Sequence, residues 1–263
     1  MTDPTTHAAL HRRFDAVICD NDGCLSPEDQ TPFDIASLAL IREHNRLAHE
    51  VGDRPSLTLC TGRPIAFVEA MARLLGCTLP VMGENGAYLW FPDRNRFELD
   101  PAITTDQLDA VEELEHWIRA DFVPRGVSIQ PGKTASVSLH HDDTELLRTE
   151  VRSAVEARVA EEGWPLRVSM TWFYINCDLT HVSKATAIDR FCAHTGLTSD
   201  RLAGIGDTTS DRFIRERVAW FGCPANAQDD VKAFSDAVSG ATLAEGVVEL
   251  LSGLTDSAPA TER

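Results

Sequence analysis

The feature that most constrains this chain is a short apolar run that ends in two carboxylates. Val17-Ile18-Cys19 predicts a buried strand, and Asp20-Asn21-Asp22-Gly23 follows it directly. Because the side chains of a strand alternate between its faces, Asp20 and Asp22 should leave the strand on the same side. Like charges held so close need a cation between them or a proton on one of them. An ordinary Asp-Gly turn that closes a hairpin would also account for these residues, so the run predicts either a reactive site or a turn.

Short apolar strands alternate with amphipathic helices at both ends of the chain. In the first part, strands are predicted over residues 17–19, 56–60 and 79–82, with helices over 34–48 and 64–75 between them. After residue 182, strands are expected over 202–206, 218–221 and 237–238, and helices over 183–194, 208–217, 227–234 and 244–251. This alternation is typical of a parallel sheet with helices on both faces. We therefore predict an α/β fold with a doubly wound, mostly parallel, Rossmann-like core.

The middle of the chain has a different pattern of predicted secondary structure, in which hairpins alternate with helices. Strands are expected over residues 87–91, 96–99, 127–130, 135–140, 166–170 and 173–177, and helices over 105–120 and 144–162. This arrangement is typical of an α+β module. We predict an inserted α+β cap domain over residues 84–181, between two parts of the core over 14–83 and 182–253. Residues 254–263 are expected to form a disordered tail.

Charge and cysteine content limit the partners of this protein. It has 41 acidic and 24 basic residues and a formal charge of −17, which opposes binding to nucleic acids and anionic membranes. No apolar run is long enough to span a bilayer. The seven cysteines form no C-x-x-C pair, which favours reduced thiols over disulfides or a zinc site. We expect a cytoplasmic protein, a monomer or a homodimer, whose partner is a small molecule.

Residues capable of chemistry recur where the predicted core strands end. Asp20 and Asp22 follow the first strand, Thr61 follows the second, and Asp207 follows a later one. Lys184 opens the helix with which the chain returns to the core. Open α/β sheets bind ligands beyond the carboxyl ends of their strands. The convergence of these positions favours a ligand site over unrelated turns, an exposed lysine and helix caps.

A second acidic cluster indicates a metal ion. Asp207 and Asp211 are four residues apart at a predicted helix start, and therefore share a face. On their own they could simply cap that helix. Together with Asp20 and Asp22 they would crowd one crevice with carboxylates, which is tolerable around a hard cation such as Mg²⁺. Mg²⁺ commonly shares its ligand shell with a phosphate, whose other contacts the lysine and threonine named above would supply.

Other chemistries are less well supported by the sequence. Neither a G-x-G-x-x-G motif after the first strand nor a Walker A motif is present, so a dinucleotide or P-loop site is not expected. Cys24 and Cys60 are close to the predicted site, but no histidine neighbours either of them. Their apolar surroundings would raise rather than lower the pKa of the thiols. A cysteine nucleophile is therefore not expected.

Taken in order, the motifs resemble those of a known superfamily. Asp20-x-Asp22-Gly23, Thr61-Gly62-Arg63, Lys184 and Gly206-Asp207-x-x-x-Asp211 resemble the four motifs of haloacid dehalogenase (HAD) hydrolases. The insert resembles the α/β cap of the Cof-like branch, and Glu84-Asn85-Gly86-Ala87 is similar to the Asn-Gly signature of that branch. The resemblance covers about residues 16–251. In detail these segments look most like archaeal-type phosphoglycolate phosphatases and, next, sucrose-phosphatase-like enzymes.

The resemblance implies a role for each matched residue. Asp20 would be the nucleophile that forms an aspartyl phosphate, and Asp22 the general acid/base, with its backbone carbonyl on the metal. Mg²⁺ would be held by Asp20, Asp22, Asp207 and Asp211. Phosphate and substrate would be bound by Thr61, Gly62, Arg63, Asn85 and Lys184. Two positions depart from the family pattern: Cys24 stands where Thr or Val is usual, and Ser210 where Asn is common, so no side-chain contact is carried over to Ser210.

The function expected from this resemblance is a Mg²⁺-dependent phosphomonoester hydrolase acting on a small phosphorylated metabolite, with 2-phosphoglycolate as first candidate. A carboxylate in the substrate would need a cation, for which the candidates are Arg63, Arg94, Arg125, Lys133 and Arg167. A sugar phosphate would instead need amide, hydroxyl and aromatic groups, which Asn85, Trp172 and Tyr174 could supply. The alternatives are a sugar-phosphate phosphatase, a phosphomutase of the same fold, or a non-catalytic phosphate-binding or regulatory protein.

Overall fold

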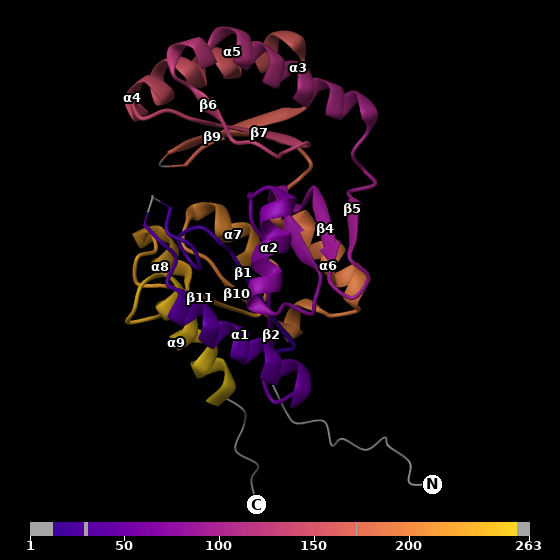
Figure 1. The fold of residues 1–263 in the computed structure, drawn as a ribbon, viewed down its shortest axis with the longest axis vertical. Coiled ribbons are helices and arrows are strands. Elements are labelled where there is room, and N and C mark those ends of the chain that lie inside the picture. Colours follow the sequence, from indigo (N-terminus) through magenta and orange to yellow (C-terminus); the bar gives the residue numbers. More distant parts are fainter. Residues whose placement is uncertain (1–12, 29–30, 172, 257–263) are drawn as a thin grey trace, which may run out of the picture.

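The structure, a computed structural model, describes residues 13–28, 31–171 and 173–256. Two parts lie one above the other along the longest axis of the molecule (Figure 1). The lower part is formed by the beginning and the end of the described chain and contains a parallel sheet. The upper part is formed by the middle of the chain and contains an antiparallel sheet.

The lower part is organised around a sheet of five parallel strands in the order β12-β11-β10-β1-β2. The strands are β1 (Ala16–Cys19), β2 (Ser56–Leu59), β10 (Leu202–Ile205), β11 (Trp220–Cys223) and β12 (Ala237–Val238). Every residue of β1 and β10 is buried, as expected for central strands covered on both faces. Cys19 is in register with Leu59 and with Ile205, so the carboxyl ends of β2, β1 and β10 lie side by side.

Helices cover both faces of this sheet (Figure 1). On one face, α1 (Ile35–Glu50), α2 (Ile65–Leu75) and α9 (Leu243–Asp256) share an apolar core with Val17 and Cys19. On the other face, α6 (Lys184–Thr195), α7 (Arg212–Arg215) and α8 (Asp229–Phe234) share a second core with Ala16 and Ile18. The predicted doubly wound α/β core is therefore confirmed. None of the helices that the structure describes has the length and apolar character needed to cross a membrane.

A short hairpin extends the lower sheet. β3 (Val81–Gly83), β4 (Tyr88–Phe91) and β5 (Arg96–Leu99) form an antiparallel sheet. A parallel bridge between Cys60 and Met82 joins this sheet to the end of β2. The side chains of Leu89 and Phe91 are buried in the lower core. The domain boundary expected at residue 84 therefore falls between β3 and the hairpin that pairs with it.

The upper part is an α+β unit, and we call its residues 105–179 the inserted unit. Its sheet has the order β6-β7-β9-β8, from β6 (Ser128–Ile129), β7 (Ser136–His140), β8 (Leu166–Met170) and β9 (Tyr174–Leu179). α3 (Thr105–Asp121), α4 (Thr144–Leu146) and α5 (Arg152–Glu162) lie on the face of this sheet that points away from the lower part (Figure 1). Val137, Leu139 and Ile175 pack into the apolar core beneath those helices.

Most predicted helices and strands are present with ends that differ by one or two residues, and two predictions differ more. The helix expected over 208–217 is a 3₁₀ turn (Thr209–Asp211) followed by the short α7. The reason is that the carboxylate of Asp211 accepts hydrogen bonds from the backbone N–H groups of Asp207 and Thr208. The disordered tail expected over 254–263 is wrong for its first three residues, because α9 continues to Asp256 and Leu254 packs into the lower core. Residues 257–263 lie outside the described part of the chain.

Candidate active site

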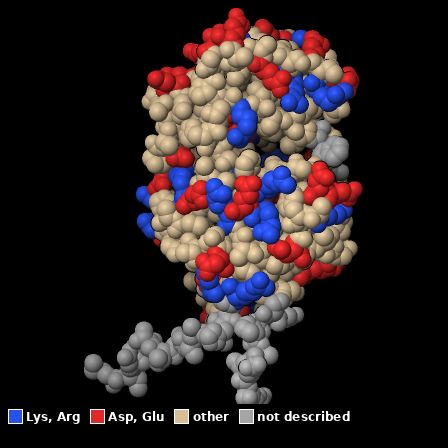
Figure 2. Space-filling view, turned by 180° about the vertical axis from the view of Figure 1, so that it is seen from behind, with Lys and Arg blue, Asp and Glu red and all other residues tan. Residues whose placement is uncertain are grey.

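A cavity of about 420 Å³ lies between the inserted unit and the lower part. Its floor comes from the loops that follow β1, β2 and β10 and from the start of α6, and its roof comes from β8, β9 and the turn between β6 and β7. Figure 2 shows a hollow where the two parts meet, with acidic and basic side chains around it. The floor contributes Asp20, Asp22, Thr61, Gly62, Arg63, Lys184 and Ser210; the roof contributes Lys133, Arg167, Ser169, Thr171, Tyr174, Asn176 and Asp178.

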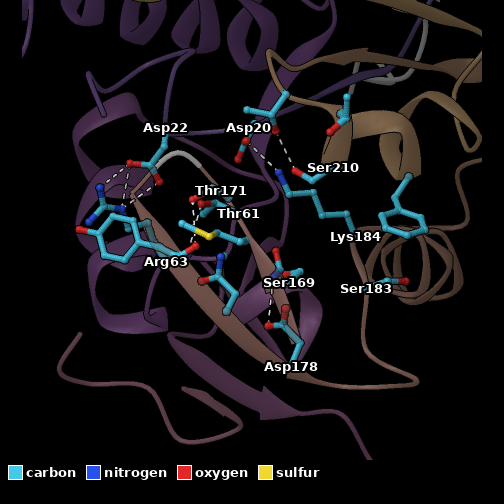
Figure 3. Close-up of a pocket in the computed structure, with 18 of the residues that line it drawn as sticks. Asp20, Asp22, Thr61, Arg63, Ser169, Thr171, Asp178, Ser183, Lys184 and Ser210 are labelled. Atoms are coloured by element: carbon cyan, nitrogen blue, oxygen red, sulfur yellow. Dashed lines mark hydrogen bonds and ion pairs between the residues drawn. The ribbon is translucent and has the colours of Figure 1, made fainter. Parts of the chain in front are cut away.

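Asp20 and Lys184 form a buried ion pair on the floor (Figure 3). Asp20 is the first residue after β1, and one carboxylate oxygen lies 2.8 Å from the ammonium nitrogen of Lys184. The other oxygen accepts a hydrogen bond of 2.8 Å from the N–H of Asn21. The Lys184 ammonium also donates to Asp211 at 2.6 Å. Burial disfavours its charge, but the negative charges of Asp20 and Asp211 outweigh burial and raise the pKa of Lys184 above its usual value.

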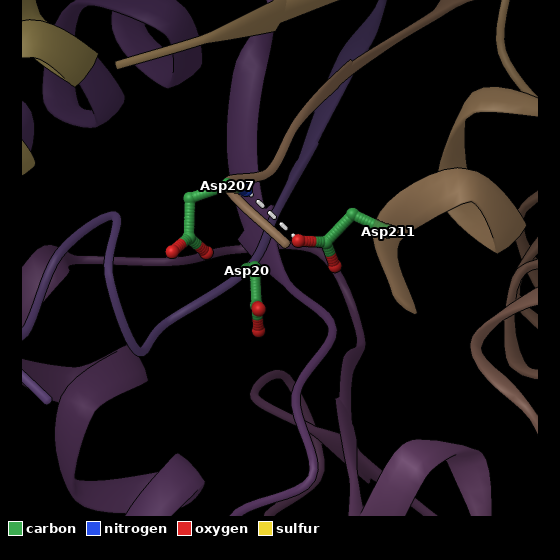
Figure 4. Close-up of side chains that lie close together, drawn as sticks. All are labelled: Asp20, Asp207 and Asp211. Atoms are coloured by element: carbon green, nitrogen blue, oxygen red, sulfur yellow. Dashed lines mark hydrogen bonds between the residues drawn. The ribbon is translucent and has the colours of Figure 1, made fainter. Parts of the chain in front are cut away.

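Three buried carboxylates converge beside this ion pair (Figure 4). Each of Asp20, Asp207 and Asp211 offers an oxygen that lies within 4.8 Å of the others. Burial, followed by the negative charge of Asp211, raises the pKa of Asp20 to about 7 and that of Asp207 to about 9. The raised pKa values mean that these carboxyl groups hold protons more tightly, because negative charges crowded together are unfavourable. A bound cation would balance the charges and displace the protons. An all-oxygen donor set of this kind fits a hard cation such as Mg²⁺.

The two acidic residues that follow β10 have different surroundings. One oxygen of Asp211 accepts two backbone hydrogen bonds, and the other accepts from Lys184. Asp207 accepts only a long contact of 3.9 Å from the thiol of Cys24 among the described residues. Asp207 therefore keeps free lone pairs for a cation, whereas Asp211 is largely occupied in holding the loop and Lys184 in place.

Gly23 allows the loops after β1 and β10 to approach closely. Its φ of +76° lies in the left-handed region, and a Cβ at this position would lie 1.9 Å from a carboxylate oxygen of Asp207. The carbonyl of Gly23 accepts a hydrogen bond of 2.8 Å from the side-chain amide of Asn226. The glycine of the first motif is thus required both by backbone conformation and by the space that Asp207 occupies.

Asp22 lines the same cavity as Asp20, but its carboxylate pairs with an arginine side chain rather than with Lys184 (Figure 3). The guanidinium Nε of Arg63 lies 2.9 Å from each carboxylate oxygen of Asp22, in a bidentate pair. The Arg63 guanidinium also lies over the ring of Phe67, at 5.3 Å from its centre. Because Arg63 is turned toward Asp22, it is held as a part of the floor rather than extended toward a ligand.

The loop after β2 offers hydrogen-bond donors to the cavity. Thr61 is buried, and its hydroxyl oxygen accepts a hydrogen bond of 3.2 Å from the N–H of Arg63. The backbone N–H groups of Asp22 and Gly62 find no acceptor among the residues that the structure describes. Free N–H groups beside a lysine are suited to binding an anion. The predicted residues Thr61, Gly62 and Lys184 are therefore brought together on one wall.

Asn85 connects the floor to the roof. It lies just after β3 with a φ of +53°, and its side-chain amide donates a hydrogen bond of 3.2 Å to Asp178 on β9. A Cβ on Gly62 would lie 3.2 Å from the amide oxygen of Asn85. The neighbouring Glu84 is buried and accepts hydrogen bonds from the N–H groups of Thr134 and Ala135, at 3.1 and 2.9 Å. This segment thus joins the lower part to the inserted unit.

The roof was largely missed by sequence reasoning. Ser169, Asn176 and Asp178 were not proposed as site residues, although they line the cavity. A usable signal was present, because polar residues alternate with apolar ones along β8 and β9 and so share one face. Of the basic candidates, Lys133 and Arg167 line the cavity, whereas Arg125 is exposed and pairs with Glu150. Arg94 pairs with Asp93 outside the cavity.

The aromatic, cysteine and serine residues considered from the sequence differ in whether they line the cavity. Tyr174 lines the roof, and Trp172 lies outside the described residues. Cys24 and Cys60 are fully buried, and burial raises the pKa of both thiols, which agrees with the expectation that neither is a nucleophile. Ser210 lines the cavity, but its hydroxyl lies 2.8 Å from that of Thr208 and contacts no acidic residue of the cluster.

The chain is similar in sequence to known hydrolases and phosphatases. Residues 128–251 match the sequence model of the haloacid dehalogenase-like hydrolases. A protein of Methanospirillum hungatei named phosphoglycolate phosphatase is 26% identical over 237 residues, which is 89% of this chain and 94% of that protein.

Two of the solved structures that share the fold illustrate the similarity. A haloacid dehalogenase-like hydrolase from Bacteroides thetaiotaomicron has a TM-score of 0.69 and 16% identity, with 92% of this chain and 99% of that chain covered. The sucrose-phosphatase of Synechocystis, solved with sucrose and phosphate, has a TM-score of 0.64 and 17% identity, with coverages of 92% and 98%.

Proposed function

We propose that this chain, a haloacid dehalogenase-like phosphatase, hydrolyses small phosphomonoesters with Mg²⁺ and through an aspartyl phosphate on Asp20. The enzyme class is confirmed by the family match over residues 128–251 and by relatives named as phosphatases. The metal, the covalent intermediate, the role of each residue and the substrate are our proposals.

One arrangement of side chains carries the proposal. Asp20 lies at the carboxyl end of a central strand, with Lys184 on one side and Asp207 within 4.8 Å on the other. A ligand that enters the cavity meets this carboxylate beside free backbone N–H groups. A buried nucleophile next to an ammonium and an oxygen-ligand metal site is what phosphoryl transfer requires, because the reaction depends on positioning and on neutralising oxygen charge.

The two steps of hydrolysis can be assigned to residues of the floor. An oxygen of Asp20 would attack the phosphorus atom, and the bond to the alcohol oxygen would break as Asp22 gives that oxygen a proton. Water would then attack the aspartyl phosphate, return a proton to Asp22 and release phosphate. Because Asp22 is bound by Arg63 in this structure, its carboxylate must turn from the guanidinium toward the leaving oxygen before each proton transfer.

The other floor residues would bind and orient the phosphoryl group. Lys184 would neutralise its negative charge, and the hydroxyl of Thr61 with the N–H groups of Asp22 and Gly62 would donate hydrogen bonds to its oxygens. Asp20, Asp207 and Asp211, with the carbonyl of Asp22, are the residues that would hold Mg²⁺. When bound, the cation would neutralise charge on the transferring phosphoryl oxygens.

The inserted unit would act as a cap over the reaction. It supplies the roof of the cavity, and Glu84 and Asn85 bind it directly to the lower part. Phosphoryl transfer to Asp20 is favoured when bulk water is excluded, and hydrolysis of the aspartyl phosphate requires one water molecule. A cap that opens and closes meets both requirements. We place its hinges at residues 83–86 and 179–183.

The substrate that we favour is a compact phosphorylated carboxylic acid, with 2-phosphoglycolate first. The support comes from relatives of that name, such as those of Methanospirillum hungatei and Methanopyrus kandleri. A sugar phosphate is the second candidate, because a cavity of about 420 Å³ exceeds the needs of phosphoglycolate and its roof carries hydroxyl and amide groups. The structural neighbour solved with sucrose and phosphate has the same fold.

The test is a measurement of phosphate release from a panel of metabolites, with and without Mg²⁺. The panel should contain 2-phosphoglycolate, phosphoglycerates and hexose phosphates at equal concentration, together with hexose 1-phosphates to detect transfer to a second hydroxyl. A kcat/KM for a hexose phosphate more than about tenfold above that for 2-phosphoglycolate, or about 1.4 kcal/mol in transition-state binding, would reject the carboxylic acid. Absence of any phosphate release would reject the phosphatase itself and favour a binding protein.

A further inference from the structure

The basic residues of the cavity differ in one respect, which is whether a carboxylate balances them. The basic side chains that line it are Arg63, Lys133, Arg167 and Lys184. Lys184 pairs with Asp20 at 2.8 Å, Arg63 pairs with Asp22, and Arg167 lies 3.8 Å from Asp178. Lys133 is different: among the described residues, no carboxylate oxygen lies within 4 Å of its ammonium nitrogen.

The contacts of Lys133 are with neutral groups. Its ammonium donates to the hydroxyl of Ser138, which in turn donates a hydrogen bond of 2.6 Å to the side-chain oxygen of Asn176. Burial lowers the pKa of Lys133, and the more distant negative charges of Asp178 and Glu84 oppose that decrease only in part. Lys133 is partly buried, and a positive charge that is partly withdrawn from water without a paired counter-ion is costly to a folded protein. Its presence is explained if an anion that binds in the cavity balances it.

The position of Lys133 is set by the lower part on both sides of it. A Cβ on Gly132 would lie 3.6 Å from Pro64, the residue after Arg63. On the other side, the N–H groups of Thr134 and Ala135 donate to the buried carboxylate of Glu84. The turn between β6 and β7 is thus docked between the loop after β2 and the segment after β3. Lys133 is therefore held in the cavity that Thr61, Gly62 and Lys184 also line.

We propose that Lys133 determines specificity by binding a second anionic group of the substrate, a carboxylate on the carbon chain that bears the phosphate ester. This inference rests on the proposed phosphatase function. Ser138 and Asn176 orient the ammonium, and docking of its turn against Pro64 and Glu84 makes the contact available in the closed form. The phosphate is bound by the floor and the carboxylate by the roof, so an ester with only one anionic group leaves Lys133 unbalanced.

The test compares two esters of the same size that differ in the second charge. 2-Phosphoglycolate carries a carboxylate where 2-hydroxyethyl phosphate carries a neutral hydroxymethyl group. The wild type should favour 2-phosphoglycolate by about 100-fold in kcat/KM, as expected for one charge-assisted contact in a desolvated site. Lys133→Met should lower that preference at least about 30-fold, mostly through KM, and Lys133→Arg should retain much of it.

The control is Arg125→Met, which removes one positive charge from the same unit outside the cavity. It should leave the preference at its wild-type value. If Lys133→Met keeps the preference within about threefold of wild type, or if Arg125→Met lowers it equally, the inference is wrong while the phosphatase function stands.

A second readout separates this inference from turnover. Binding of 2-phosphoglycolate should raise the thermal unfolding midpoint of the wild type, and this increase should be absent in Lys133→Met and present in Arg125→Met. Without ligand, Lys133→Met should unfold at or above the wild-type temperature, because a partly buried charge without a counter-ion has been removed. Equal increases with ligand in all three proteins, or a lower midpoint of ligand-free Lys133→Met, would show that Lys133 is structural. An ester that binds through Lys133 but is not hydrolysed would refute the proposed function and not the contact.

Discussion

The floor and the roof of the cavity are built differently. On the floor, the charged side chains of Asp20, Asp22 and Lys184 are each engaged by an oppositely charged partner. On the roof, neutral polar side chains such as Ser169 and Asn176 accompany one lysine that no described carboxylate balances. These three floor residues are paired within the protein, whereas Lys133 on the roof has no carboxylate oxygen within 4 Å among the described residues. This difference is the basis of our proposal that the floor supplies the chemistry and the roof selects the substrate.

The largest expected effect is the loss of the nucleophile. Asp20→Asn should lower kcat by about four orders of magnitude or more on every ester, because no other group of the floor replaces the attacking oxygen. The rate of phosphate release from one ester at saturating concentration measures kcat. Asp109 is exposed on α3, so Asp109→Asn serves as the control. Equal losses for charged and neutral esters would support the division between floor and roof. Retained turnover in Asp20→Asn would move catalysis to another residue.

Removal of divalent cations should also abolish turnover. Excess EDTA should stop phosphate release and Mg²⁺ should restore it, because Asp20, Asp207 and Asp211 form an oxygen-only cluster. Zinc should not be required, since the cluster contains no cysteine or histidine ligand. Full activity in EDTA would show that the floor works without a metal.

A smaller loss is expected where the floor depends on backbone geometry. Gly23→Ala places a methyl group 1.9 Å from the Asp207 carboxylate, so the loop must shift and kcat/KM should fall about 100-fold. Gly52→Ala is the matched control: Gly52 has a similar φ of +77°, and nothing lies within 4 Å of its Cβ position. Gly52→Ala should lower stability through backbone strain and leave kcat/KM unchanged. Equal kinetic effects of the two substitutions would show that strain, not Asp207, is responsible.

Motion of the roof relative to the floor should appear in hydrogen exchange. A phosphate mimic such as orthovanadate with Mg²⁺ should increase protection at residues 83–86 and 179–183, where the chain passes between the two parts. The physical reason is that closure holds Glu84 and Asn85 against the inserted unit. Helix α1, far from the cavity, is the internal control. Unchanged protection at both joints would mean that the roof does not move during the reaction cycle.

The smallest effect concerns a polar group within the floor itself. The side chain of Asn21 is fully buried, and neither of its amide atoms has a hydrogen-bond partner among the described residues. Asn21→Leu should therefore raise the free energy of unfolding by about 1 kcal/mol. Asn45 is the matched control, because it is also buried but donates to the carbonyls of Leu57 and Leu75. Asn45→Leu should lower the free energy of unfolding, which denaturant titration measures for both variants. A lower free energy of unfolding in Asn21→Leu as well would show that the Asn21 side chain is stabilised in the folded protein.

The sequence by itself determined the parts of this protein that depend on local pattern. Short apolar runs and helical periodicity predicted the parallel core, because each element follows from residues that are neighbours in the chain. The ends of β1, β2 and β10 predicted Asp20, Thr61 and Asp207, because parallel strands in register bring their carboxyl ends together. The glycine after Asp22 was likewise readable, since a left-handed residue is marked by its type.

Only the tertiary structure decided the contacts that join distant segments. The pairing of Asp22 with Arg63, the docking of Thr134 on Glu84 and the polar face of β8 and β9 all depend on how separate elements pack. From the sequence, Lys133 was one basic candidate among several. The sequence does not distinguish a lysine in a cavity from a lysine that is solvated on the surface. That Lys133 is partly buried and has no carboxylate within 4 Å among the described residues follows from how the two parts pack, and no local pattern encodes the distance between them.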